Sequence, residues 1–231
     1  MRTTNAVAIA IHGVALIALL GAAGRAGAQD ATPPYSRMAP IEQYFMEPSA
    51  EIALARTAAP ASISSNAEVL VLGQHGFEPA VKGTNGFVCI VERSWTGAPD
   101  ADFWNPKVRV PICYNAAAAR TYLPRNVEAT RLILAGRTKA QVEQAIIAAT
   151  DDQLPPVAPG AMCYMLSKEG FGGDSIPHWP PHLMFFYSNT DPATWGAGLP
   201  GSPVLASSDP RERLTTFAVA VSRWSDGTEG R

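Results

Sequence analysis

Basic side chains are few in this chain of 231 residues, and they nowhere form a cluster. The 18 Lys and Arg are outnumbered by 20 Asp and Glu, which gives a formal net charge of −2 at pH 7. Binding to nucleic-acid phosphates needs a basic face, and so does attraction to acidic lipids. We therefore expect neither a nucleic acid nor an acidic membrane surface as a partner.

Long apolar runs are also scarce, and the one that approaches membrane thickness lies at the N-terminus. Arg2 precedes an almost wholly apolar stretch, residues 6–23, and Ala26-Gly27-Ala28 follows with small residues in the A-x-A pattern. This order predicts a signal peptide over residues 1–28. A membrane anchor is the weaker interpretation, because glycines and His12 dilute the run and no basic segment follows it. We expect a periplasmic or secreted protein without membrane insertion after signal cleavage.

Only three cysteines occur, Cys89, Cys113 and Cys163. In an oxidising compartment they allow three single bridges, and the sequence alone does not choose among them. We predict the Cys89–Cys113 bridge, because both residues lie beside turn signals and a long loop rich in Trp, Pro and Asp separates them. The alternative is three buried, reduced thiols that pack as small apolar side chains.

Periodicity and turn residues predict one α+β domain over residues 47–226. Strands are expected over residues 68–72, 77–82, 87–91, 161–166, 182–187 and 214–221, the first three as an antiparallel meander. Helices are expected from Pro48 to Pro60, over residues 116–122 and 126–135, and from Thr138 to Leu154, where Gln141 completes a capping box. The segregation of strands and helices indicates a mainly antiparallel sheet with three to four helices packed on it.

The remaining segments lack periodicity. Residues 29–46 are predicted to be an extended N-terminal segment because several prolines remove backbone donors. Residues 94–112, rich in Trp and Pro, are predicted to be a long loop or flap. Residues 227–231 are predicted to be a flexible tail.

The segment Gly173–Phe186, GDSIPHWPPHLMFF, carries the sharpest chemical pattern. His178 and His182 are four residues apart, and Asp174 lies four residues before His178. Imidazole nitrogens with a carboxylate suit zinc and similar divalent ions. The prolines exclude a helix here, so the three side chains would have to meet in a loop. The alternative is that both histidines are structural or solvent-exposed.

Two nucleophile patterns are weaker. Gly173-Asp174-Ser175 resembles the Gly-Asp-Ser block of the SGNH-type esterases, but it lies late in the chain and no histidine follows His182 to serve as its base. Cys113 precedes an expected helix N-terminus, which would lower the pKa of its thiol. No histidine is near it in sequence, so a disulfide or a core position is favoured.

Several tryptophans fall outside the expected strands and helices. Trp95, Trp104 and Trp179 are candidates for stacking on a small-molecule ligand, because indoles on loops suit sugars and aromatic ligands. The alternative is that each ring folds down to cover an end of the sheet.

Four segments together look like a group of exported bacterial proteins of unassigned function: residues 85–93, 111–114, 162–165 and 178–186. The likeness spans nearly all of the chain after the expected signal peptide, and it implies a single exported domain without naming an activity. From the residues themselves we predict an exported domain that binds a small ligand or a metal ion through residues 171–182. The alternatives are a metal-dependent hydrolase, and a structural or protein-interaction domain without a catalytic site.

Overall fold

One sheet organises the part of the chain that this computed structural model describes, residues 34–230. Its strands are β1 (Glu68–Gly73), β2 (Gly76–Val81), β3 (Val88–Glu92), β4 (Val110–Tyr114), β5 (Met162–Met165), β6 (His182–Ser188), β7 (Val204–Asp209) and β8 (Leu214–Ala220). They lie in the order β2-β1-β3-β4-β5-β6-β8-β7. Every neighbouring pair except β1 and β3 is antiparallel. The mainly antiparallel α+β domain predicted from the sequence is thus confirmed.

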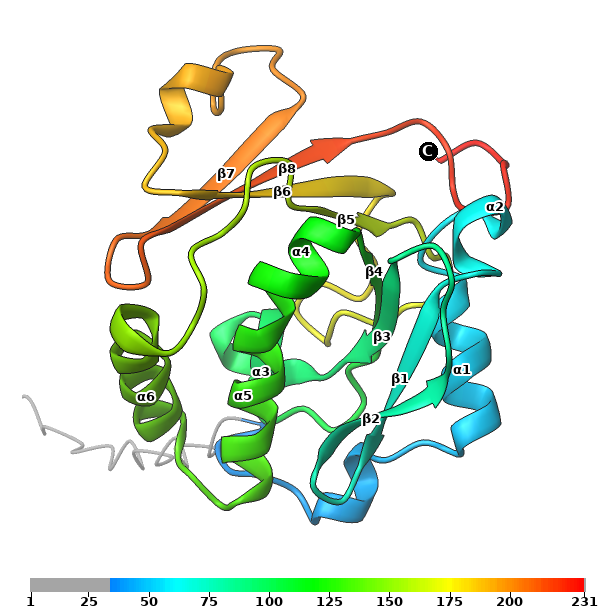
Figure 1. Cartoon of the computed structure of the whole chain (residues 1–231), viewed down its shortest axis with the longest axis vertical. Helices are drawn as coiled ribbons and strands as arrows, with labels where there is room; N and C mark the ends of the chain where they lie inside the picture. Colours follow the sequence, from blue (N-terminus) through cyan, green and yellow to red (C-terminus); the bar gives the residue numbers. More distant parts are fainter. Residues whose placement is uncertain (1–33, 231) are drawn as a thin grey trace, which may run out of the picture. The chain divides into compact units, whose positions relative to one another are not determined.

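Helices cover both faces of the half of the sheet that contains β1, β3 and β4 (Figure 1). They are α1 (Pro48–Arg56), α2 (Ala61–Ser64), α3 (Ser94–Gly97), α4 (Ala116–Thr121), α5 (Leu123–Leu134) and α6 (Lys139–Asp152), with short 3-10 turns η1 (Ile41–Tyr44), η2 (Asp100–Asp102) and η3 (Pro192–Trp195). On one face, α1 packs against Cys89 and Val91. On the other face, Ile90 and Ile112 pack against the segment of α4 and α5. Two apolar layers therefore enclose this half of the sheet.

The helix predictions hold with one correction at Pro124. In α6 the Thr138 side chain accepts the Gln141 N–H (3.3 Å), and the Gln141 side chain accepts the Thr138 N–H (3.0 Å), so the predicted capping box is present. The sequence predicts helices over residues 116–122 and 126–135, with Pro124 in the gap between them as the residue that ends the first helix. Pro124 lies instead in the first turn of α5, where the missing N–H has no intrahelical partner to lose.

The predicted antiparallel meander of the first three strands is wrong, because β3 pairs with β1 in parallel, with Glu68 opposite Val88. The chain from β2 passes back across the start of β1 and enters on its other side. Gly83 permits this passage: a Cβ there would lie 2.2 Å from the Glu68 nitrogen. The Thr84 N–H donates to the Asn66 carbonyl oxygen (2.9 Å) and fixes the crossing.

Two strands were not predicted, for different reasons. β4 lies partly inside the expected loop of residues 94–112. It contains Pro111, which has no N–H to donate to the hydrogen bonds of a sheet, so the sequence pattern did not indicate a strand. β7 is an edge strand with mostly exposed and polar side chains, so it lacks the alternation of a half-buried strand.

The ends of the described region are more ordered than the sequence indicates. In the segment predicted to be extended, Tyr44 is fully buried and its hydroxyl donates to the Trp104 carbonyl oxygen (2.8 Å). Residues 222–230, which include most of the predicted flexible tail, form a small hairpin that the Ser225 N–H ties to Leu166 (2.9 Å). The signal-peptide prediction falls on residues 1–28, outside the described residues. Among residues 34–230, each helix is too short or too polar to span a bilayer.

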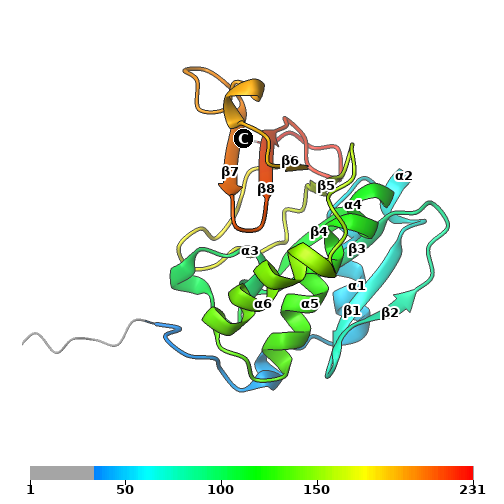
Figure 2. The ribbon, with the colours of Figure 1, turned by 60° about the vertical axis from the view of Figure 1, so that its left-hand side comes forward.

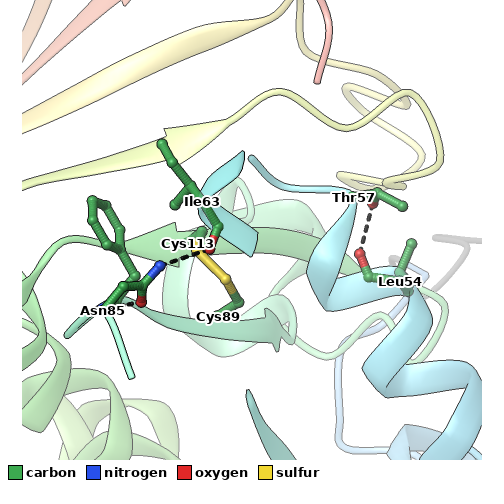
Figure 3. Close-up of a disulfide and its surroundings, with 7 residues drawn as sticks. Leu54, Thr57, Ile63, Asn85, Cys89 and Cys113 are labelled. Atoms are coloured by element: carbon green, nitrogen blue, oxygen red, sulfur yellow. Dashed lines mark hydrogen bonds between the residues drawn. A yellow bond between two sulfur atoms is a disulfide. The ribbon is translucent and has the colours of Figure 1, made fainter. Parts of the chain in front are cut away.

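The predicted disulfide between Cys89 and Cys113 is confirmed. The two residues are direct partners across β3 and β4, and their sulfurs lie on the face that α1 covers (Figure 3). Cys163 is buried with a free thiol on the opposite face. A disulfide of this kind persists in oxidising compartments.

A buried ion pair joins α1 to the end of β3. Arg93 and Glu51 are both essentially inaccessible to solvent, and the Arg93 Nη2 lies 2.9 Å from the Glu51 Oε1. The same guanidinium donates through Nε to the Tyr44 carbonyl oxygen (2.7 Å) and through Nη1 to the Val91 carbonyl oxygen. All three nitrogens of Arg93 are therefore engaged on the face away from Glu92.

Loss of the disulfide should lower stability substantially. We expect Cys89→Ala/Cys113→Ala to reduce the free energy of unfolding by about 3 kcal/mol, because the bridge closes a loop of 24 residues in the unfolded chain. Urea unfolding followed by circular dichroism measures this. Cys163→Ala is the control, since it removes a buried sulfur without removing a bridge, and an equal loss in both variants would contradict the expectation.

Loss of the buried guanidinium should also be costly. We expect Arg93→Met to destabilise the protein by roughly 3–5 kcal/mol, because it leaves the Glu51 carboxyl buried without its cation. Lys168→Met breaks an exposed pair with Asp226 (2.8 Å) and should change stability by less than about 1 kcal/mol. Similar values for the two variants in the same urea titration would overturn this account.

Candidate functional site

Glu92, the last residue of β3, is the most unusual polar side chain of the sheet. It points to the face opposite the disulfide and is only 5% exposed. Its Oε1 accepts hydrogen bonds from the Tyr114 hydroxyl and from the Asn126 Nδ2 (2.6 Å). The Asn126 Nδ2 also donates to the Tyr114 oxygen (2.9 Å), which closes a triangle of side chains from β3, β4 and α5.

The hydrogen bonds from Tyr114 and Asn126 both reach Oε1 of Glu92. The other oxygen, Oε2, faces α3, where a Cβ added to Gly97 would lie 3.5 Å from it. The nearby Thr96 hydroxyl donates to the Arg93 carbonyl oxygen (3.1 Å). Glu92 therefore presents Oε1 to Tyr114 and Asn126, and Oε2 to α3 and the side chain of Thr96.

Burial raises the pKa of Glu92 to about 7, against its usual value of 4.5, although hydrogen bonds from Tyr114, Thr96 and Asn126 oppose the rise. The carboxyl is thus close to half protonated at neutral pH. Burial also raises the pKa of the Tyr114 phenol well above its usual value, so Tyr114 stays a hydrogen-bond donor throughout the neutral range.

Glu92 lines a cavity of about 600 Å³ on this face of the sheet. One wall is residues 96–99 of α3 and the turn after it, and the opposite wall is residues 205–207 of β7. Side chains of β5, β6 and β8 form the floor. The layer of α4 and α5 reaches part of this floor, since α4 contacts β5 and Tyr122 stacks on Phe186 of β6. Figure 2 shows the β7–β8 hairpin with α3 beyond its turn. The lining is mostly apolar, with Glu92 as its one carboxyl.

His182, the first residue of β6, contributes the one imidazole ring to the lining of this cavity. Its Nδ1 lies 2.8 Å from the Pro180 carbonyl oxygen, so Nδ1 carries the proton and donates. Burial lowers the pKa of His182, which keeps the ring neutral and leaves Nε2 as an acceptor. The Trp179 and His182 ring centroids are 6.2 Å apart, so the two rings share one end of the cleft.

Large apolar side chains are exposed at the rims of this cavity. Among the described residues, such exposure is found at Trp179 (40%), Leu199 (62%) and Leu205 (64%). Trp179 and Leu205 both line the cavity, one on each side, and Leu199 does not. The cavity is therefore an open apolar cleft with a buried carboxyl.

The predicted loop of residues 171–182 reaches this cleft, with Gly172, Trp179, Pro180 and His182 in its lining. It is held in place by Asp102, a buried carboxylate that accepts the N–H groups of Asp174 (3.1 Å) and Ser175 (3.0 Å). The sequence did not identify this anchor, because Asp102 lies in a segment without periodicity.

The three predicted metal ligands do not form a metal site in residues 34–230. His182 is buried and bonded to Pro180, whereas His178 and Asp174 are exposed, and the Asp174 carboxylate accepts the Tyr35 hydroxyl. His178 and His182 border one hollow of about 30 Å³, without a third ligand. Within the described residues, no group of three or more His, Cys, Asp or Glu is placed to hold a metal ion.

The other two predicted ligand-stacking tryptophans lie away from the cleft. Trp95 is buried, and its indole N–H donates to the Thr130 hydroxyl oxygen (3.0 Å). Trp104 packs against the same apolar cluster, which includes Tyr44 and Phe103. For both tryptophans the structure agrees with the alternative interpretation, in which the indole ring packs on the core instead of contacting a ligand.

Glu92 was missed from the sequence, although a signal is present. The strand VCIVE is apolar apart from this one residue, and all of its last four positions are buried. A carboxyl in such a run has to be neutralised or hydrogen-bonded, which marks it as a candidate site residue.

Comparison of the chain with protein-family models, with curated proteins and with solved structures finds no match in any of the three. The functional argument consequently depends on the geometry of the cleft.

Titration of Glu92 should make stability fall as pH rises. A raised pKa in the folded state means that the folded protein holds a proton that the unfolded chain releases, so the stabilisation is complete below pH 4.5 and lost as pH rises through about 7. We expect the difference in unfolding free energy between wild type and Glu92→Gln to change by about 3 kcal/mol in this direction between about pH 4 and about pH 8. Urea titrations across that range measure it, and parallel pH profiles would refute it.

Proposed function

We propose that this protein binds a small, largely apolar organic molecule in the cleft between α3 and β7. The observation that carries the proposal is the cavity of about 600 Å³ with an apolar lining and a few convergent polar groups. Ligand sites in proteins have this size and composition. Glu92, Tyr114 and His182 would supply the polar contacts, and the sheet side chains the apolar surface.

Exposed apolar surface on both rims supports this proposal. Trp179 and Leu205 leave much of their area in contact with water, which costs roughly 25 cal/mol for each Å² of apolar surface. A ligand seated between them would remove that area from water. Exposed apolar side chains that line a cleft are typical of binding grooves.

The cellular setting of the proposal is an oxidising compartment outside the cytoplasm. The buried Cys89–Cys113 bridge supports such a setting, and the signal peptide predicted over residues 1–28 agrees with it. We therefore propose a periplasmic or secreted binding protein. The alternative of a metal-dependent hydrolase has no set of ligands among residues 34–230.

Blocking the cleft should abolish binding of an apolar probe. We expect the neutral dye Nile red to bind the wild type saturably, and Leu205→Arg to weaken binding at least about tenfold, since it places a charge on the apolar wall. Fluorescence titration measures both affinities.

Leu199→Arg is the matched control, because Leu199 is as exposed as Leu205 but lies outside the cleft lining. It should bind the dye as the wild type does. Circular dichroism melting curves establish that both variants fold. Failure of the wild type to bind, or equal weakening in both variants, would reject the cleft as the site and favour a structural or interaction role.

A further inference from the structure

Glu92 has no counter-charge in the cleft. The lining contains no Lys and no Arg. The neighbouring Arg93 turns to the opposite face, where its guanidinium binds Glu51 and two backbone carbonyl oxygens. The next guanidinium, that of Arg125, lies 2.6 Å from the Glu212 carboxylate and is neutralised there. An ionised Glu92 is therefore an unpaired negative charge at the base of an apolar cavity.

We propose that the ligand of this cleft is a small organic amine, with its ammonium group on Glu92 Oε2 and its apolar body on the floor of β5, β6 and β8. This inference rests on the proposed function and names the chemical class of the ligand. Oε2 faces α3 on a side chain that is 95% buried, and Tyr114 and Asn126 fix the carboxyl through Oε1. The Thr96 hydroxyl beside it also has the Arg93 carbonyl oxygen as an acceptor (3.1 Å), so an ammonium group can take its place on Oε2. The acceptor is thus oriented before the ligand arrives.

Charge complementarity selects this class over the others. A buried carboxylate costs several kcal/mol when it is unpaired, and an ammonium within hydrogen-bond distance offsets that cost. An anionic ligand would meet Glu92 with repulsion and find no cation in the lining. A neutral alcohol could accept the proton of a protonated Glu92, but it would gain no ion pair.

The groups around Glu92 leave it as the residue that changes charge near neutral pH. It is faced by Tyr114 of β4, by Tyr122 between α4 and α5, and by Cys163 of β5, and burial raises the pKa of all three. His182 of β6 stays neutral, because burial lowers its pKa. Beyond Tyr122, the Arg125 Nε lies 2.6 Å from the Glu212 carboxylate.

Amine binding should consequently expel the Glu92 proton. Affinity for an amine is expected to rise by up to about tenfold per pH unit below pH 7 and to level off above it. Affinity for a neutral ligand of the same shape should lack this rise. The difference between these two pH profiles distinguishes binding through an ion pair with Glu92 from binding through apolar contacts alone.

The test compares phenylbutylamine, phenylbutanol and phenylbutyrate, which share one apolar body, by isothermal titration calorimetry at about pH 8. We expect the amine to bind at least about tenfold more tightly than the alcohol, and the carboxylate to bind most weakly. Glu92→Gln keeps the shape of the side chain and should abolish the preference for the amine. Leu205→Arg should weaken binding of both the amine and the alcohol, and that of the amine more, because the added guanidinium repels the ammonium group.

The outcomes distinguish the two proposals. Equal affinity for amine and alcohol in the wild type, or an undiminished preference in Glu92→Gln, would overturn the amine inference and leave the cleft proposal standing. If none of the three ligands binds, the amine inference fails. If Nile red also does not bind, the proposed function fails with it.

A second measurement covers the case in which Glu92→Gln does not fold. Titrations of wild type with the amine in buffers of different ionisation enthalpy give the number of protons released. Nearly one proton per bound amine is expected at about pH 6, and close to none at about pH 9. No release at about pH 6 would reject the pairing with Glu92.

Discussion

The buried ion pair between Arg93 and Glu51 is the interaction on which the rest of the structure depends. It ties α1 and the segment before it to the end of β3, one residue from Glu92. Because its guanidinium is fully engaged there, the strongest nearby cation is withheld from the cleft. The Arg93 side chain thus holds α1 and the segment before it against one face of the sheet. Because it points to that face, it leaves the Glu92 carboxyl on the other face without a cation. The alternation of side chains along a strand makes this division possible.

The two faces of the sheet therefore have different roles. The face under α1 holds the disulfide and tightly packed small side chains, and it contributes stability. The opposite face is covered by α4 and α5 from β3 to part of β6, and it opens into the cleft beside Met165, His182 and the strand β8. The triangle of Glu92, Tyr114 and Asn126 stands at the boundary between the covered part and the open part. At this boundary the Glu92 carboxyl is buried and still lines the cleft.

The sequence predicts those features that depend on neighbouring residues. The capping box of α6 and the apolar runs of most strands are of this kind. Trp179 and His182, which were predicted as ligand-binding and metal-binding residues, both line the cleft. The parallel pairing of β3 depends on how Gly83 passes the backbone of Glu68, which no local pattern reveals. The cleft depends on residues more than 100 positions apart, Glu92 and Leu205, that meet only after β7 joins the sheet. The role of Glu92 in the apolar strand β3 can be inferred only when its hydrogen-bond partners and its position in the cleft are known.

The anchoring of residues 171–182 by Asp102 gives the cleft two walls of unequal stiffness. The loop and the segment after α3 are joined through backbone donors on one buried carboxylate, so on this side they form a single unit. The opposite wall, β7, is an edge strand that pairs with β8 alone. Widening the cleft on the first side would require breaking charge-assisted hydrogen bonds to Asp102, whereas on the second side it would bend an edge strand that has a single neighbour. The width of the cleft is thus constrained more strongly by the loop than by β7.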